Sequence, residues 1–414
     1  MAKRTRVAIV GAGDRGTAFG RIIASIPEWA EVTAVAEPRR EYREIFAAQY
    51  KLAPAAVFTD WPGLAARAAE LCDAVIVCTP DRDHVAPAVA FLEKGRHMLL
   101  EKPMATSLED CRRIARAQAA AGTVTSVCHS LRYNRGFATL KQLVDSGRIG
   151  RVVTVDQLEQ VAWWHQAHSF VRGKWGNEGR SSFMLLAKSC HDIDYIAHLV
   201  GRECRRVQSF GSLTFFTREN APAGSAERCV DCSLVKTCPY SAVRVYVDAD
   251  REDWPAEVVS PDHSREAHLR AITEGPYGRC VWKCDNDVVD HQVVSMEFET
   301  GVTATFTMTA FTQAGGRKIR VHGTEGDVEF TEEKMVVRTF ADARREEIVF
   351  ERDQGGHGGG DERLLVSFLG AVREGKPSLV LTDVQESLRT HTIVFAAERS
   401  RRQGRMVELE EMGA

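Results

Sequence analysis

A glycine-rich turn near the start of the chain has the residue types and the spacing of a phosphate-binding site. Gly11, Gly13 and Gly16 stand in the G-x-G-x-x-G pattern. The first glycine permits a tight turn, the second lets a pyrophosphate approach the backbone, and the third lets a helix pack on the preceding strand. The free N–H groups at the start of that helix attract phosphate, and Asp14 and Arg15 lie beside them. The pattern predicts a dinucleotide-binding site.

The predicted strands on either side of the turn support the same site. Residues 7–10 form an apolar strand that runs into the turn, and residues 31–36 form a second strand that ends at Glu37. A carboxylate at that strand end accepts hydrogen bonds from the adenosine ribose and repels a 2′-phosphate. Glu37 therefore favours NAD as the cofactor, and the neighbouring Arg39 and Arg40 leave NADP as the alternative.

Further candidate ligands follow the ends of two later predicted strands, residues 74–78 and 97–100. They are Thr79, Pro80 and His84 after the first strand, and Glu101 and Lys102 after the second. Because the ligands of an open parallel sheet bind at the carboxyl ends of its strands, we expect all of them beside the dinucleotide. A lysine at that position can hydrogen-bond a reacting hydroxyl group and help to move its proton, and the preceding glutamate can orient it.

The segment 163–175 combines three tryptophans, two histidines and two basic residues. Indole faces stack on the apolar faces of sugar rings, and histidine and arginine side chains bind hydroxyl groups. We predict that this segment covers the substrate side of the cleft. Its candidate contacts are Trp164, His165, His168, Arg172 and Trp175. The alternative is a tryptophan cluster in the core or at a subunit contact.

Five cysteines are clustered in the stretch 217–288, which has little hydrophobic periodicity and is interpreted as an insertion. Their C-x2-C-x5-C and C-x3-C spacing is typical of the thiolate ligands of a metal ion. A structural zinc ion would stabilise an insertion that has little core of its own. The four ligands that we predict are Cys229, Cys232, Cys238 and Cys280. The alternatives are an iron–sulfur cluster and free thiols.

The order of the predicted elements indicates the fold class. Residues 1–128 alternate strand and helix patterns, which is typical of a doubly wound parallel sheet. From residue 290 onward the strand patterns alternate in polarity, as in an antiparallel sheet with one covered face. Helices over 361–374 and 383–402 end the chain. We predict an α/β protein with a Rossmann domain over 1–128 and an α+β domain over 129–414.

Composition and charge exclude several classes of protein. The 414 residues include 54 basic and 57 acidic side chains, and this balance does not indicate a nucleic-acid partner. No apolar run reaches the length of a membrane span, and the first residues lead directly into a strand without a signal peptide. We therefore expect a cytoplasmic protein without a membrane partner, whose 11 cysteines stay reduced.

Together these motifs resemble the glucose–fructose oxidoreductase and inositol dehydrogenase (Gfo/Idh/MocA) family. The residues that carry the resemblance are Gly11-Ala12-Gly13-Asp14-Arg15-Gly16, Thr79-Pro80 with His84, Glu101-Lys102-Pro103 and Cys190-His191-Asp192-Ile193-Asp194. The resemblance spans most of the chain, without the cysteine insertion. It implies a Rossmann domain and a second domain with an open, mostly antiparallel sheet, through which a homo-oligomer (a dimer or tetramer) forms. The substrates that it implies are sugars, polyols or their acids.

The resemblance also implies the catalytic residues. Lys102 matches the family's active-site lysine and His191 its histidine base at the start of a helix, and Asp192 is a candidate substrate contact. A neutral imidazole can take the hydroxyl proton while a hydride leaves carbon for the nicotinamide. The family often has an aspartate four residues before the histidine, and this chain has Ala187 at that position. Either the neighbouring Lys188 replaces the aspartate or the chemistry is altered.

The motifs support three functions. The first is an NAD-dependent oxidoreductase acting on a secondary hydroxyl of a sugar, polyol or glycoside, with Lys102 and His191 assisting proton transfer. The second is a redox-neutral NAD-dependent glycoside hydrolase. It would oxidise one ring carbon of the sugar, eliminate the aglycone, add water and return the hydride to the sugar. Its extra acid–base groups would be His165, His168 and Lys188. The third is a non-catalytic regulator that senses a sugar or NAD, which the presence of Lys102 and His191 disfavours.

Overall fold

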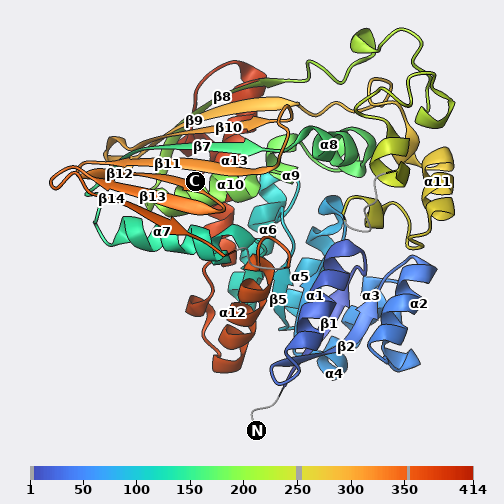
Figure 1. Cartoon of the computed structure of the whole chain (residues 1–414). Helices are drawn as coiled ribbons and strands as arrows, with labels where there is room; N and C mark the ends of the chain where they lie inside the picture. Colours follow the sequence, from blue (N-terminus) through green and yellow to red (C-terminus); the bar gives the residue numbers. More distant parts are fainter. Residues whose placement is uncertain (1–3, 249–253, 352–354, 414) are drawn as a thin grey trace.

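The computed structural model describes residues 4–248, 254–351 and 355–413, which form two β-sheets with their helices (Figure 1). No helix within these ranges is long and apolar enough to cross a membrane. The first sheet has six parallel strands in the order β3-β2-β1-β4-β5-β6. These strands are β1 (Thr5–Val10), β2 (Ala30–Ala36), β3 (Val57–Phe58), β4 (Ala74–Val77), β5 (His97–Leu100) and β6 (Thr125–Val127).

Helices cover both faces of this sheet, which explains why its central strands are almost entirely apolar. The helices of this region are α1 (Asp14–Ser25), α2 (Arg40–Gln49), α3 (Trp61–Ala66), α4 (Ala68–Leu71), α5 (Val85–Glu93) and α6 (Leu108–Ala121). Alternate residues of β1 enter two cores: Val7 and Ile9 pack on the side of α1, and Ala8 and Val10 pack on the side of α5 and α6. The predicted doubly wound parallel sheet is confirmed.

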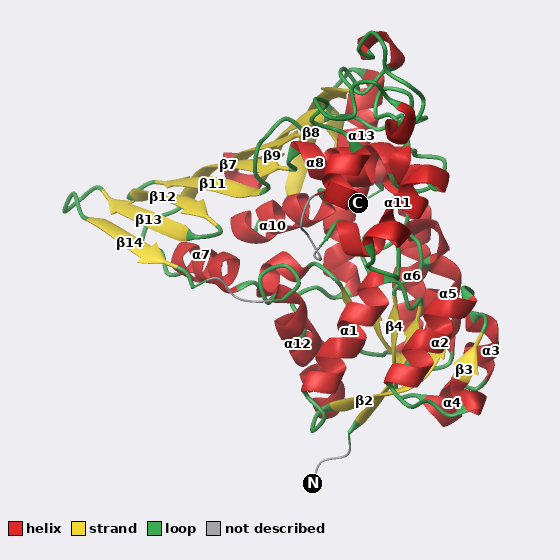
Figure 2. Ribbon diagram, turned by 45° about the vertical axis from the view of Figure 1, so that its right-hand side comes forward, coloured by secondary structure: helices red, strands yellow, loops and turns green. Residues whose placement is uncertain are grey.

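The second sheet has nine strands in the order β14-β13-β12-β11-β7-β10-β9-β8-β15, and its β7–β10 pair is parallel while the other pairs are antiparallel (Figure 2). The prediction of a mostly antiparallel sheet is therefore confirmed. The strands are β7 (Val152–Gln160), β8 (Cys204–Ser212), β9 (His291–Phe298), β10 (Thr303–Thr309), β11 (Gly316–Gly323), β12 (Gly326–Thr331), β13 (Lys334–Thr339), β14 (Arg345–Val349) and β15 (Val407–Glu408).

Three helices cover one face of the second sheet: α7 (Arg135–Asp145), α10 (Cys190–Val200) and α13 (Val384–Gln403) (Figure 1). Phe137, Ile193 and Val394, one from each helix, belong to the same buried core as Phe306 of β10. On the opposite face Phe210 of β8 is 62% exposed. This one-sided burial is the reason for the period-two alternation of the strands.

One late helix returns to the first sheet. α12 (Gly360–Glu374) places Leu364, Leu365 and Phe368 in the core that also contains Val7 and Ile9 of β1. Residues that follow β14 of the second sheet in sequence therefore complete the core of the Rossmann sheet. The remaining helices are α8 (Trp163–His165), α9 (Met184–Ala187) and α11 (Arg265–Glu274).

The insertion lies between β8 and β9 and contains α11 and short turns (Figure 1). Its weak periodicity predicted little core, yet the structure shows two small apolar clusters. The first includes Phe216, Tyr240 and Trp282, and the second includes Tyr246 and Ile272. Each cluster is assembled from residues far apart in sequence, so no local pattern could reveal it.

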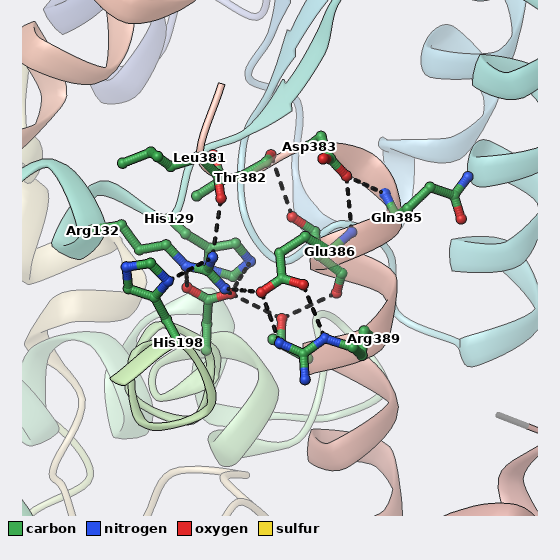
Figure 3. A network of polar contacts seen from close by, with 12 residues as sticks. His129, Arg132, His198, Leu381, Thr382, Asp383, Gln385, Glu386 and Arg389 are labelled. Carbon is green, nitrogen blue, oxygen red and sulfur yellow. Dashed lines mark hydrogen bonds and ion pairs between the residues drawn. The ribbon is translucent and has the colours of Figure 1, made fainter. Parts of the chain in front are cut away.

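A buried ionic network joins the end of the Rossmann sheet to α10 and α13 (Figure 3). Arg132, just after β6, donates from Nε and Nη2 to both carboxylate oxygens of Asp194 in α10, at 2.7 and 2.8 Å. Its Nη2 also donates to Glu386 of α13 at 2.8 Å, and its Nη1 donates to the carbonyl oxygen of Leu381 at 3.0 Å. Burial raises the pKa of Asp194, but Arg132, His129 and Thr390 together lower it below its usual value, so the carboxylate is ionised.

Replacing Arg132 by methionine should strongly destabilise the fold. The change leaves the Asp194 carboxylate buried without its cation, so we expect the free energy of unfolding to fall by about 3–5 kcal/mol. Urea unfolding followed by circular dichroism measures this. As the control, Arg206→Met removes an exposed ion pair with Glu297 and should have little effect. Equal losses in the two variants would contradict the assigned role of the buried pair.

Candidate active site

A cleft runs along the carboxyl ends of the Rossmann strands, and the segment 163–175 and the insertion line its other side. Its volume of about 1770 Å³ exceeds the roughly 300–1,000 Å³ of a typical small-molecule pocket. The cleft therefore has room for a dinucleotide and a second ligand.

The glycine turn has the shape that its spacing predicts. Gly11 has a φ angle of +93°, and a Cβ atom there would lie 2.6 Å from the carbonyl oxygen of Cys78. A Cβ atom on Gly16 would lie 1.9 Å from the carbonyl oxygen of Gly11, so a side chain there would clash with the turn. Gly13 precedes α1 without a side-chain cap, which leaves the first N–H groups of the helix for a phosphate. The turn fits a dinucleotide pyrophosphate.

Glu37 lies at the end of β2 and is 2% exposed. Its carboxylate accepts hydrogen bonds from the backbone N of Ala12 at 2.9 Å and from Nε and Nη2 of Arg39 at 2.8 and 3.0 Å. Burial raises the pKa of Glu37, but the hydrogen bonds and charge of Arg39 and the hydrogen bond from Ala12 lower it. Together they hold the pKa below its usual value. Arg40 instead pairs with Glu44 on the surface. Of the two arginines, Arg39 is thus the one that contacts Glu37, the residue predicted to recognise the ribose.

Arg15 and Glu101, both predicted cofactor contacts, bind each other. Arg15 Nε is 2.6 Å from Glu101 Oε1, and Arg15 Nη1 is 2.7 Å from Asp361 of α12. Both residues line the cleft, as do Asp14 and Pro80. The ion pairs hold α1, the end of β5 and α12 together around the floor of the cleft.

Lys102 follows β5 and lies in the cleft wall. Its Nζ donates a hydrogen bond to the carbonyl oxygen of Ala187 at 2.7 Å. The peptide bond to Pro103 is cis. The Pro103 and Thr79 carbonyl oxygens lie 2.8 and 2.9 Å from the two ring nitrogens of His84, which ties the ends of β4 and β5 together. His84 thus positions the strand ends that carry the cofactor contacts.

His191 lies in the first turn of α10, on the same cleft as Lys102. The residue is 3% exposed, and neither ring nitrogen has a hydrogen-bond partner among the described residues. The rings of His129 and His357 lie 5.7 and 5.3 Å away. Burial and then the charge of Lys102 hold the pKa of His191 well below its usual value. The ring is therefore neutral at neutral pH and can accept a proton or a hydrogen bond.

Lys188 belongs to a buried ionic network. Its Nζ is 2.9 Å from Glu159 Oε1, and Arg317 Nε is 3.1 Å from Glu159 Oε2 and 2.7 Å from Asp192 Oδ1. Gln157 also donates to Asp192 at 2.6 Å. Burial raises the pKa of Asp192 to about 6, against the lowering effect of Arg317. Lys188 and Arg317 line the cleft, whereas Asp192 lies behind Arg317 and is not part of the wall.

Four of the five substrate contacts predicted in the segment 163–175 line the cleft. They are His165, His168, Arg172 and Trp175. Trp164 instead packs on Trp254, with 5.4 Å between the ring centroids. Trp175 Nε1 donates to Asp81 at 3.0 Å, which joins the segment to the loop after β4.

Two of these histidines are neutral for the same physical reason as His191. Burial and then Lys188 hold the pKa of His165 well below its usual value, and burial and then Arg172 lower that of His168 to about 3. Nδ1 of His168 is 2.9 Å from the hydroxyl oxygen of Tyr246.

Several cleft residues were not predicted from the sequence. Trp254 and Tyr277 of the insertion, Arg317 of β11 and His357 of the glycine-rich loop all line the cleft. Glu159 was also missed, although its place at an inward position of an alternating strand marked it as a polar residue on the covered face. The other residues carry no local signal because the tertiary structure alone brings them to the cleft.

The four cysteines predicted as metal ligands line one small cavity in the insertion, apart from this cleft. In the described part of the chain, however, no three His, Cys, Asp or Glu side chains are grouped to hold a metal ion as they are placed. The zinc prediction therefore has no preformed site in the structure.

The fold and the cleft define the class of this protein: a dinucleotide-binding oxidoreductase with a separate substrate-side sheet. Residues 5–129 match the model of the oxidoreductase family with an NAD-binding Rossmann fold, and residues 137–329 match the GFO/IDH/MocA C-terminal domain. The chain belongs to the Gfo/Idh/MocA oxidoreductase family.

Individual relatives agree with this assignment. The chain is 25% identical over 317 residues to "Putative oxidoreductase YteT" of Bacillus subtilis, covering 72% of each. It is 32% identical over 209 residues to an inositol 2-dehydrogenase of Streptomyces avermitilis, covering 50% of this chain and 56% of that protein. Among solved structures, levoglucosan dehydrogenase in complex with NADH has the same fold, with a TM-score of 0.72 at 18% identity, covering 98% of this chain and 99% of that one.

The protein should bind NAD more tightly than NADP. The Glu37 carboxylate lies where a 2′-phosphate would approach, and two like charges about 4 Å apart repel by roughly 1–4 kcal/mol near a protein surface, which is about tenfold or more in affinity. Titration with both cofactors measures the ratio, which Glu37→Gln should reduce and the surface control Arg40→Gln should not. Tighter NADP binding by the unaltered protein would show that Arg39 governs the site.

Proposed function

We propose that this protein is an NAD-dependent dehydrogenase that oxidises a secondary hydroxyl group of a sugar, polyol or glycoside. One observation carries the proposal: Lys102 and His191 line one cleft with the glycine turn, and the ring nitrogens of His191 have no hydrogen-bond partner among the described residues. The names of the relatives, inositol 2-dehydrogenase and levoglucosan dehydrogenase, support a polyhydroxylated substrate.

The two residues have complementary roles in this reaction. Bound NAD⁺ would accept the hydride that leaves the carbinol carbon. Lys102 donates a hydrogen bond to the substrate oxygen, and neutral His191 takes the proton of the hydroxyl group. Ala187 stands where the family often has an aspartate, so no side-chain carboxylate is present at this position. Lys102 Nζ instead donates a hydrogen bond to the backbone carbonyl oxygen of Ala187. A neutral acceptor orients Lys102 without adding a negative charge beside the reacting carbon.

Substitution of either residue should slow the chemical step and leave cofactor binding intact. We expect Lys102→Ala and His191→Ala each to lower kcat by roughly 10²-fold or more, with NAD affinity near that of the unaltered protein. Lys94→Ala and His322→Ala, at exposed positions, are the matched controls. A variant that keeps most of its turnover would remove that residue from the mechanism.

A second candidate function, the redox-neutral glycosidase, is favoured by the extra neutral histidines. His165 and His168 line the cleft, where an imidazole ring could take part in the proton transfers of elimination and water addition. A relative 30% identical over 199 residues, covering 48% of this chain and half of that protein, is named 2,7-anhydro-N-acetylneuraminate hydratase, from Mediterraneibacter gnavus. Lys188 has a weaker claim, because Glu159 already binds it.

A panel of sugars, polyols and aryl glycosides separates these functions. The dehydrogenase should produce NADH in proportion to the substrate consumed. The glycosidase should release the aglycone with no net NADH, because its final step returns the hydride. If no compound in the panel gives either signal although NAD binds, the dehydrogenase proposal fails for these substrate classes.

We also propose that copies of the chain associate through the uncovered face of the second sheet. Helices cover its other face, while Phe210 of β8 and Val293 of β9 are 62% and 38% exposed on the uncovered one. Burial of these apolar side chains would favour association.

A further inference from the structure

A small cavity inside the insertion is enclosed by cysteine side chains from two distant segments. Its volume is about 20 Å³, which is room for roughly one water-sized occupant. The cysteines in its wall are Cys229, Cys232, Cys238 and Cys280. Cys284 is not in the wall, and its Sγ donates to the carbonyl oxygen of Cys280 at 3.3 Å. Four of the five clustered cysteines therefore line the cavity, and the fifth does not. The cavity is too small for a cluster of several iron and sulfur atoms.

Arg172 is a buried cation in the same wall, with an exposed fraction of 1%. Its Nε donates to the carbonyl oxygen of Arg279 at 2.7 Å, and its Nη2 donates to that of Tyr240 at 2.6 Å and lies 3.4 Å from Cys229 Sγ. In the described part of the chain its Nη1 has no hydrogen-bond partner, and no carboxylate there forms an ion pair with its guanidinium. A guanidinium buried without an opposite charge is costly.

We propose that these four cysteines bind one Zn²⁺ ion as thiolates and that Arg172 balances the charge of this centre. Each cysteine loses its thiol proton to solvent as its sulfur bonds the metal, so binding is pH-dependent. Four thiolates outweigh the two positive charges of the ion, and the excess negative charge lies beside Arg172. A thiolate is also a stronger acceptor than a thiol for the Nη2 hydrogen bond.

Because the four sulfur atoms are not grouped as ligands where they lie, binding requires rotation of the cysteine side chains. Each side chain already borders the cavity, so a change of side-chain rotamer can turn its sulfur inward without moving the backbone far. Cys229 and Cys280 are buried and Cys232 and Cys238 are half-buried, so the ligands are shielded from bulk solvent.

The zinc centre would stabilise the wall of the substrate cleft. Arg172 ends the helical turn Gln166–Arg172, whose His168 lines the cleft, and Arg279 Nη2 donates back to the carbonyl oxygen of Arg172 at 3.1 Å. Tyr277 of the insertion stacks on His168, with 4.7 Å between the ring centroids. Loss of the metal should therefore raise the KM for substrate and leave NAD affinity unchanged. This consequence rests on the proposed function, whereas the metal content does not.

Elemental analysis of the purified full-length protein is the first test. We expect about one zinc per chain. Cys232→Ser should lose the zinc, and Cys284→Ser, which keeps a hydroxyl donor for the Cys280 carbonyl oxygen, should retain it. In the native protein the four ligand thiols should resist a thiol reagent until a chelator is added. Chelation should also expose residues 217–288 to protease while NAD binding persists.

Three results would overturn the proposal. Metal-free protein that does not take up added Zn²⁺, with all five thiols reactive, means free thiols. Iron with visible absorbance means a cluster. Zinc that is lost in Cys284→Ser and kept in Cys232→Ser means a different ligand set. A circular dichroism spectrum confirms that each variant is folded before its metal content is compared.

The role of Arg172 has its own readout. Competition with a chromogenic chelator measures zinc affinity, which should fall by about 10–100-fold in Arg172→Met. Arg172→Lys should recover part of this loss because it restores the charge without the forked geometry. If the lysine variant binds zinc no better than the methionine variant, charge balance is not the contribution of Arg172.

Discussion

The ion pair between Arg132 and Asp194 fixes the relative positions of the two halves of the candidate active site. Arg132 directly follows β6, the last strand of the Rossmann sheet, and Asp194 lies one turn after His191 in α10. Removing both charges from water is costly, so the pair is stable only because nearly every polar atom has a partner. The hydroxyl group of Thr390 donates a further hydrogen bond to Asp194. The carboxylate of Glu386 in α13 accepts a further hydrogen bond from Arg132. His191 thereby faces the strand end that carries Lys102.

Three histidines of the cleft next to this junction, His165, His168 and His191, are kept neutral. Burial disfavours the charged imidazole, and the cations Lys102, Lys188 and Arg317 add to the effect. Two of these cations are themselves bound to carboxylates behind the cleft wall. The result is a set of neutral imidazoles beside several cations, and under the proposed function these cations would stabilise negative charge on a substrate oxygen.

The insertion contributes to the cleft as well as to its own stability. Trp254 and Tyr277 line the substrate side, and Tyr277 stacks on His168 of the segment 163–175. The insertion thus supplies aromatic surface to the cleft. Its two small apolar clusters are too limited to hold a long irregular segment firmly, since small cores give little stability by themselves.

The sequence by itself determined the Rossmann sheet and the alternating second sheet, because these follow from local periodicity and from glycine spacing. It also singled out most of the residues that line the strand-end side of the cleft. The tertiary structure alone decided that α12 returns to the first sheet and that Arg317 and His357 reach the cleft. It also decided that Arg15 binds Glu101, that Asp192 lies behind Arg317, and that four cysteines share one cavity. These contacts join residues far apart in the chain, and their geometry depends on packing that no local pattern records.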